Sequence, residues 1–218
     1  MLRWIDRFLN SSIGRKALMA CTGLLLIGFL IAHLAGNLSL YKGEGAFDEY
    51  AHFIGGLEVL PLAEAGLALL FLVHIYMAVR TTIENRSARP IKYGITGTHG
   101  KKTASSTTMF LTGLVILGFL IKHLWDFRLH KAAFEVAPEE VVRTTLGQPL
   151  TAVVYLLGVT ALGLHLFHAF ASAFQTLGVN HPKYTPALTW IGRVLAVVVA
   201  LGFASFPLIF WLGQGGAH

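Results

Sequence analysis

The feature that most constrains this chain is an apolar segment, ending in a histidine, that occurs twice. Residues 22–34 read TGLLLIGFLIAHL, and residues 112–124 read TGLVILGFLIKHL. Nine of the thirteen positions are identical, and three more exchange one aliphatic residue for another. A histidine inside a hydrophobic span is costly to bury and is a functional candidate by default. His33 and His123, in the same register of two copies, suggest two faces of one binding site.

The composition is that of a polytopic membrane protein. Hydrophobic residues make up 55% of the 218 residues and charged residues only 13%, with a mean hydropathy of +0.64. Such values lie outside the soluble globular range. Cys21 is the single cysteine, which excludes an internal disulfide, a C-x-x-C-H haem attachment and a cysteine-ligated iron–sulfur cluster. Residues 1–16 have no apolar core of their own, so we expect a retained first helix and not a cleaved signal peptide.

Five segments are long and apolar enough to cross a hydrocarbon core, which needs roughly 20 residues per helix. They predict an all-α membrane protein that forms a single membrane domain over residues 1–218. The expected helices cover about 17–40, 59–80, 105–126, 149–173 and 188–212.

The distribution of charge predicts the orientation. The N-terminus, the segment from Arg80 to Lys102 and the segment from the fourth loop to Arg193 carry twelve of the seventeen Lys and Arg residues, against only Asp6 and Glu84. The positive-inside rule therefore places the N-terminus in the cytoplasm and the C-terminus outside. This asymmetry also accounts for the net charge of +6, so no nucleic-acid partner is expected. The first four helices then form two parallel two-helix repeats around a pseudo-two-fold axis along the membrane normal. We expect a four-helix bundle with a peripheral fifth helix.

Four histidines lie at two depths in these helices. With a rise of 1.5 Å per residue, His33 is roughly 25 Å and His74 roughly 9 Å from the inner edge of the membrane. His123 lies near the outer end of the third helix, and His165 lies in the inner half of the fourth. Depth pairs His33 with His123 near the outside, and His74 with His165 near the inside. His168 competes with His165, because its depth also suits His74.

Two imidazoles that face each other across an apolar four-helix core are the usual axial ligands of a b-type haem. Two such pairs predict two b-haems. Two glycines recur in both copies of the apolar segment, as Gly23 and Gly28 and as Gly113 and Gly118. They would let the macrocycle approach the backbone, or would only allow close helix packing. The competing interpretation is a haem-free scaffold or transporter whose histidines form hydrogen bonds or a proton path. His181, in the basic fourth loop, is a candidate contact for a haem propionate or for a partner subunit, or an ordinary surface histidine.

Several motifs resemble the cytochrome b subunit of succinate dehydrogenase or fumarate reductase, in the type that has one five-helix anchor and two haems. They are SSIGRK at 11–16, followed by Met19-Ala20 and Thr22-Gly23, then HLAGNL at 33–38, FDEYA at 47–51 and AFQTLGVNHPKY at 173–184. The resemblance covers most of the chain, but not residues 126–148.

This resemblance implies that His33, His74, His123 and His165 ligate the two haems, and it favours His165 over His168. It implies a bacterial-type cytoplasmic membrane and two partners on the cytoplasmic face, an iron–sulfur subunit and a flavoprotein subunit with covalent FAD that holds the dicarboxylate site. It also implies a quinone substrate, with menaquinone suited to the dihaem type. A cytochrome b of another membrane dehydrogenase remains an alternative, and a higher oligomer remains open.

Two positions depart from the pattern of some members of that family. Phe53-Ile54 precede Gly55-Gly56 where a glutamate would stand at a quinone site, and Gly163 replaces a glutamate of the fourth helix that takes part in proton transfer. We therefore do not assign the quinone-binding role or the proton-transfer role to these positions of this chain. Glu58 and Glu64, near the start of the second helix, remain the candidates for binding quinone or accepting its protons.

Overall fold

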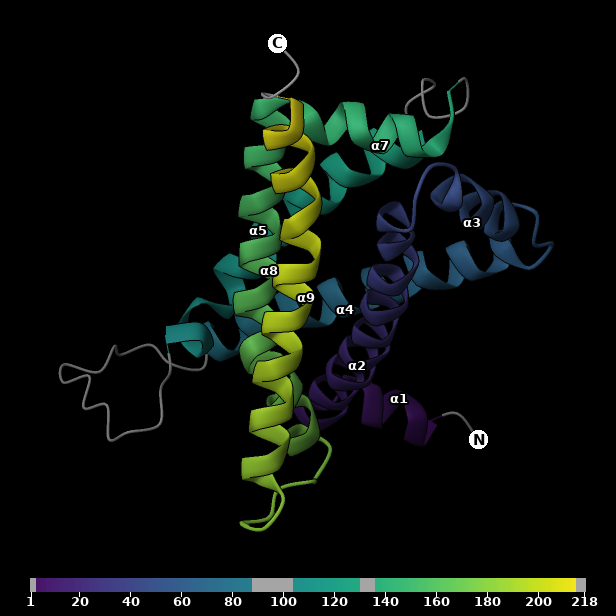
Figure 1. Ribbon diagram of the computed structural model, residues 1–218. Coiled ribbons are helices and arrows are strands. Elements are labelled where there is room, and N and C mark those ends of the chain that lie inside the picture. The colour runs from purple at the N-terminus through teal and green to yellow at the C-terminus, as the bar shows by residue number, and fades with distance from the viewer. Residues whose placement is uncertain (1–2, 88–103, 130–135, 215–218) are drawn as a thin grey trace.

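The structure is a computed structural model that describes residues 3–87, 104–129 and 136–214, and every regular element in these ranges is helical (Figure 1). The elements are α1 (Arg3–Asn10), α2 (Ser12–Asn37), a 3₁₀ turn η1 (Leu38–Tyr41), α3 (Ala46–Gly55), α4 (Leu60–Ser87), α5 (Ala104–Leu124), a π-helical turn η2 (Trp125–Leu129), α7 (Pro138–Gly147), α8 (Pro149–Thr176) and α9 (Thr185–Gln214).

Within the described residues, five helices are long and apolar enough to cross a membrane, which is the number expected from the sequence. They cover Ser12–Tyr41, Leu60–Ser87, Thr108–Leu129, Pro149–Thr176 and Thr185–Gly213. The second predicted loop, apart from Ser87, lies outside the described residues. Four basic residues used for the orientation therefore lie outside them too, namely Arg89, Lys92, Lys101 and Lys102.

Local signals set where the long helices begin. Ser11 caps α2, because its hydroxyl accepts the backbone N–H of Gly14 at 2.9 Å, as serine commonly does at this position. Pro149 opens α8, where its missing N–H costs no hydrogen bond. Gly45 precedes α3 with φ of 78°, a left-handed conformation that favours glycine.

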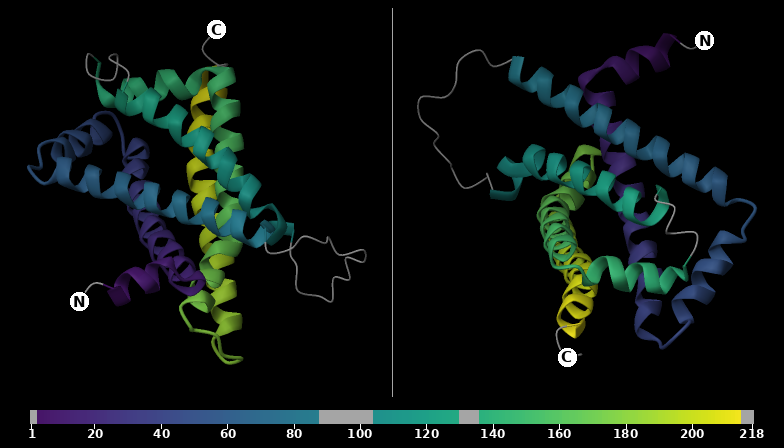
Figure 2. Two further views of the ribbon diagram at one scale, coloured as in Figure 1. Left: turned by 180° about the vertical axis from the view of Figure 1, so that it is seen from behind. Right: turned by 90° about the horizontal axis from the view of Figure 1, so that it is seen from above.

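The long helices pack unequally. Figures 1 and 2 show α8 and α9 side by side along their length, with α5 against α8 and α4 crossing α2. Helix α2 also contacts α8 and α9. One apolar core joins Leu34 of α2 to Tyr155 and Phe206, and a second joins Ile27 of α2 to Leu166 and Val199. Helix α9, expected to be peripheral, thus contributes to both cores, whereas α4 contributes no buried residue.

Small residues allow α9 to approach α8 closely. A Cβ at Gly163 would lie 2.8 Å from the Cβ of Ala200, and one at Gly192 would lie 2.9 Å from the Cβ of Phe170. Both distances are too short for ordinary contact, so the interface needs glycine at these positions. This gives a packing reason for Gly163 at the position where some similar proteins carry glutamate.

Two short helices that the sequence did not predict, α3 and α7, lie at the end of the molecule where α9 finishes, opposite α1 (Figure 1). A polar network joins them. The N–H of Glu139 donates to Asp48 at 2.7 Å, and the Glu139 carboxylate accepts the N–H of Gly45 at 3.2 Å and pairs with Arg143 at 2.7 Å. Asp48 belongs to the FDEYA motif, which therefore has a structural task in connecting two segments.

Candidate cofactor-binding histidines

Each inner histidine lies against the preceding membrane-spanning helix, His74 against α2 and His165 against α5. His74 of α4 has its Nδ1 atom 3.2 Å from the carbonyl oxygen of Met19 and 3.3 Å from the hydroxyl of Thr22, both on α2. A carbonyl can only accept a hydrogen bond, so the proton of a neutral His74 is on Nδ1. The lone pair is then on Nε2, which is the form of imidazole that binds a metal through Nε2.

The second repeat reproduces this arrangement. His165 of α8 has its Nδ1 atom 3.2 Å from the hydroxyl of Thr112 on α5, and the carbonyl of Met109 is also a hydrogen-bond partner of His165. His74 and His165 lie close enough for their charges to interact. The two histidines that the depth argument paired near the inside therefore have matching threonine contacts in the two repeats.

The outer histidines meet directly. The ring centroids of His33 on α2 and His123 on α5 are 5.8 Å apart, and the ring planes stand at 85°. Aromatic rings surround the pair. Phe29 and Phe203 lie 5.3 and 5.6 Å from His33. The other rings lie 5.3 to 6.1 Å from His123, and they are Phe119, Phe127 and Tyr155.

The two outer rings have weaker polar partners than the inner rings. The Nδ1 atom of His33 lies 3.4 Å from the amide nitrogen of Asn37, whose firmer bond, at 2.7 Å, is to the His33 carbonyl. The Nδ1 atom of His123 is buried and has no hydrogen-bond partner among the described residues. This pair is positioned by ring packing more than by hydrogen bonds.

The repeated glycines divide into two kinds. A Cβ at Gly23 would lie 3.2 Å from Cε1 of His74, and one at Gly113 would lie 3.8 Å from Cε1 of His165. These glycines make room for the inner imidazoles. Gly28 and Gly118, five residues before the outer histidines, would place a Cβ with no described protein atom within 4 Å, so no described side chain packs on them.

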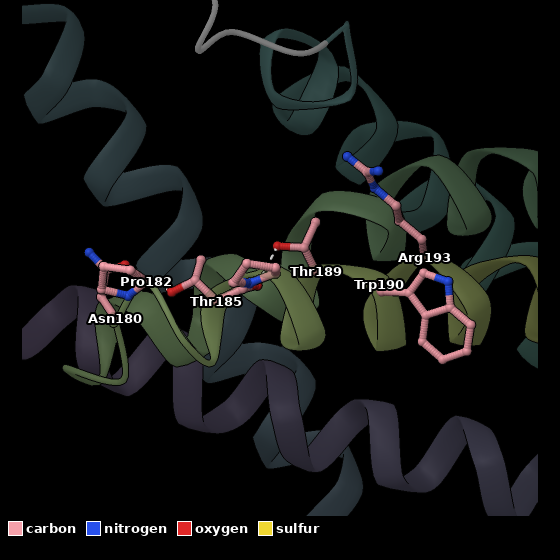
Figure 3. Close-up of a pocket in the computed structure, with 7 residues that line it drawn as sticks. Asn180, Pro182, Thr185, Thr189, Trp190 and Arg193 are labelled. Atoms are coloured by element: carbon pink, nitrogen blue, oxygen red, sulfur yellow. Dashed lines mark hydrogen bonds between the residues drawn. The ribbon is translucent and has the colours of Figure 1, made fainter.

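His168 and His181 lie apart from these pairs. His168 is half-buried on α8, three residues beyond His165 and within electrostatic range of it. His181 is exposed between α8 and α9, where its Nδ1 accepts the N–H of Lys183 and its ring lies 5.4 Å from that of Tyr184. Beside it is a groove of about 760 Å³ whose lining includes Asn180, Trp190 and Arg193 (Figure 3).

The two acidic quinone candidates differ in their surroundings. Glu58 is exposed in the turn before α4. Glu64, on the first turns of α4, forms a two-pronged ion pair with Arg128 of η2 at 2.9 and 3.0 Å. Glu64 thereby links α4 to the turn that follows α5, the helix that carries His123 of the outer pair.

A buried carboxylate near the outer pair was missed in the sequence. Asp126 accepts two hydrogen bonds from Lys122 at 2.7 Å and one from the hydroxyl of Tyr155 at 2.8 Å. Its side chain is only 8% exposed, and Tyr155 also packs on His123. The signal available in the sequence was the i, i+4 spacing of Lys122 and Asp126, but nothing there indicated Tyr155.

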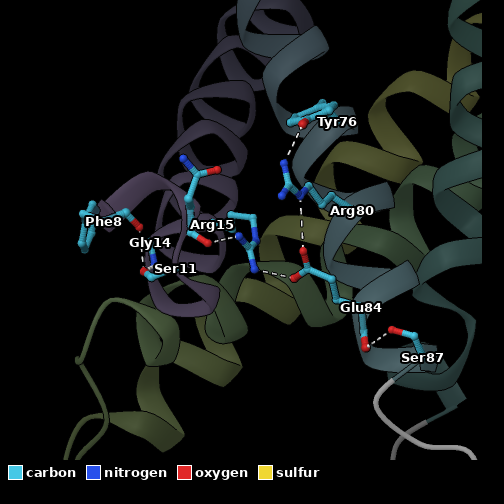
Figure 4. Close-up of polar contacts among 9 residues, drawn as sticks. Phe8, Ser11, Gly14, Arg15, Tyr76, Arg80, Glu84 and Ser87 are labelled. Carbon is cyan, nitrogen blue, oxygen red and sulfur yellow. Dashed lines mark hydrogen bonds and ion pairs between the residues drawn. The ribbon is translucent and has the colours of Figure 1, made fainter. Parts of the chain in front are cut away.

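A second polar network lies at the inner end of α2 and α4 (Figure 4). Buried Arg15 pairs with Glu84 at 2.5 Å and also donates to the carbonyl of Asn10. Glu84 accepts from Arg80 at 3.3 Å, and Arg80 donates to the Tyr76 hydroxyl at 2.9 Å. Glu84 and the two arginines tie the first repeat together on the side that the sequence predicts to be cytoplasmic.

Comparison with known proteins gives one relative over nearly the whole chain. The chain is 25% identical over 201 residues to the succinate dehydrogenase cytochrome b558 subunit of Bacillus subtilis, which covers 89% of this chain and 94% of that protein. No family model matches the chain, and no solved structure matches it. With its five candidate membrane helices, this chain is a distant homologue of the succinate dehydrogenase cytochrome b558 subunit.

Proposed function

We propose that this chain is the dihaem cytochrome b membrane anchor of a succinate:quinone oxidoreductase. The observation that carries the proposal is the meeting of four histidines from four different membrane helices as two pairs, His33 with His123 and His74 with His165. The similarity to a cytochrome b558 subunit gives the enzyme class.

The residues at both pairs fit a haem. A metal-bound histidine usually donates its other ring N–H to a carbonyl or similar acceptor. The Nδ1 atom of His74 lies 3.2 Å from the Met19 carbonyl, and the Nδ1 atom of His165 lies 3.2 Å from the Thr112 hydroxyl. His33 and His123 would hold the outer haem, because their two imidazoles come from different helices and their ring centroids lie 5.8 Å apart. Apolar and aromatic side chains surround the outer rings, as suits a buried porphyrin.

When bound, the two haems would supply one-electron transfer between an iron–sulfur subunit on the cytoplasmic face and a quinone in the membrane. The chain's own residues hold the macrocycles by the four imidazoles and exclude water with the apolar faces of α2, α5 and α8. The exposed basic loop that holds His181 and Lys183 belongs to the face proposed for the iron–sulfur partner, which in turn would carry the FAD-containing flavoprotein. His181 is also the proposed contact for a propionate of the inner haem.

The quinone would bind near the outer pair, with Glu58 and Glu64 as candidates to hold it or to take its protons. Asp126 and Tyr155 extend this set, because their short hydrogen bond lies beside His123. Menaquinone is the proposed quinone, by resemblance alone. The proposed orientation puts the N-terminus in the cytoplasm of a bacterial-type membrane. Helix α1 lies at the end of the molecule opposite the carboxyl end of α9 (Figure 1), as five membrane crossings would require in either orientation.

The first experiment is a reduced-minus-oxidised spectrum with pyridine haemochrome quantitation on the chain purified with its native partners. We expect two b-haems per chain and a co-purifying covalent flavoprotein. A folded preparation without haem would overturn the proposal in favour of a haem-free scaffold or proton path. Haem without the flavoprotein would point to another membrane dehydrogenase.

A further inference from the structure

We propose that Thr22 and Thr112 are positioning residues that fix the rotation and the tautomer of the two inner haem ligands. Each threonine, together with a main-chain carbonyl three residues before it, would form an acceptor site for the Nδ1–H of the histidine on the following helix. This inference rests on the proposed function, since it assigns a task toward the inner haem.

The proton count supports this direction of bonding. The hydroxyl of Thr22 has one proton, which goes to its own helix, to the carbonyl of Leu18 at 2.8 Å or of Met19 at 3.1 Å. Its lone pairs are then free to accept from His74, whose Nδ1 lies 3.3 Å away. The same carbonyl of Met19 accepts from that nitrogen at 3.2 Å, so the imidazole N–H is shared between two acceptors.

The second repeat has the same contacts. Thr112 donates to the carbonyls of Thr108 at 3.1 Å and Met109 at 3.0 Å, and its oxygen lies 3.2 Å from Nδ1 of His165. Both threonines are buried, with exposures of 4% and 6%. If these hydroxyls only bonded to carbonyls of their own helices, they would not need to lie beside a histidine at the corresponding position of both repeats.

Other membrane-helix threonines show what the purely local arrangement looks like. Thr160 of α8 donates to the carbonyl of Leu156 at 2.7 Å and is exposed. It makes the bond from i to i−4 that threonine commonly makes within a helix. Thr160 is therefore a control with the same residue type and the same local bond in another membrane-spanning helix, but it has no described contact with an imidazole.

Hydrogen-bond donation from Nδ1 makes an imidazole a more basic ligand. A more basic ligand favours the oxidised metal, so it lowers the reduction potential of the haem. Replacement of threonine by valine keeps the branched shape and removes only the hydroxyl acceptor. The inner haem should then rise in potential and its ligand ring should be freer to rotate.

The test uses the complete enzyme complex with Thr22→Val, Thr112→Val, the double variant and the control Thr160→Val. Redox titration and low-temperature EPR would follow each haem, with the inner haem identified as the signal that His74→Ala removes. We expect an upward shift of the inner-haem potential and a shift of its largest g-value, additive in the double variant. The outer haem and the Thr160→Val protein should be unchanged.

The serine variants Thr22→Ser and Thr112→Ser keep the hydroxyl and should keep the wild-type potential and g-value. If the valine variants lose the inner haem, serine variants that retain it support the inference, and serine variants that also lose it overturn it. Unchanged potential and g-value in the double valine variant, or an equal shift of both haems, would overturn it as well. A wild-type complex without haem would instead refute the proposed function.

Discussion

The inner and outer histidine pairs use opposite means of support within one pair of repeats. His74 and His165 rest on polar groups of the neighbouring helix, a carbonyl and a threonine hydroxyl in each case. His33 and His123 rest on each other and on aromatic rings. The difference teaches that two pairs of repeat-related histidines in one molecule can be held by different interactions. Hydrogen bonds fix a ring's tautomer, whereas ring packing fixes only its place.

Removal of a ligand should have the largest effect and should separate the two pairs. We expect His74→Ala to lose the inner haem and interrupt electron transfer to quinone, because alanine offers no ligand. His168→Ala, the matched control on α8, should keep both haems. Pyridine haemochrome quantitation and quinone reductase activity measure this. Loss of a haem in His168→Ala with retention in His165→Ala would reassign the ligand.

Disruption of the buried carboxylate should affect the outer pair alone. Asp126→Asn removes the charge that pairs with Lys122 and accepts from Tyr155. A buried hydrogen-bond network that loses one partner typically costs about 1–3 kcal/mol, so a lower Tm is expected. The outer-haem spectrum should change, since Tyr155 packs on His123. Tyr155→Phe is the milder comparison, and an altered inner haem would contradict the independence of the two pairs.

Replacement of the acidic quinone candidates, Glu58 and Glu64, should affect the binding of quinone more than the stability of the protein. Glu64→Gln breaks an exposed ion pair with Arg128, and such pairs contribute less than about 1 kcal/mol. We expect both haems to remain and the KM for quinone to rise, with Glu58→Gln compared in the same assay. An unchanged KM in both variants would remove these residues from the quinone site.

The smallest effect is expected at the inner loop. His181 is exposed and bonds only locally within the described contacts, so His181→Ala should keep Tm and haem content. A small shift of the inner-haem potential, with the outer haem unaffected, is the expected sign of a propionate contact. Identical redox titrations of the variant and the wild type would leave His181 a surface residue.

Sequence reasoning identified the features that depend on local pattern. The five apolar stretches gave five membrane-helix candidates, and the repeat placed His33 in register with His123 and suggested the equivalence of His74 and His165. It did not find α3 or α7, because amphipathic helices of ten residues are stabilised mainly by what they pack against. It also left α9 at the periphery, since a uniformly apolar helix does not reveal which face meets which neighbour.

What the sequence alone determined is the class of the chain and its chemistry-bearing residues. Long apolar runs must form helices in a membrane because no water satisfies their backbone, and a histidine within them stands out by its cost. Only the tertiary structure decided which side chains meet, such as Thr22 with His74 and Asp126 with Tyr155. Those contacts depend on how each helix is rotated and crossed against its neighbours. Packing across the whole molecule sets that geometry, and no single helix encodes it.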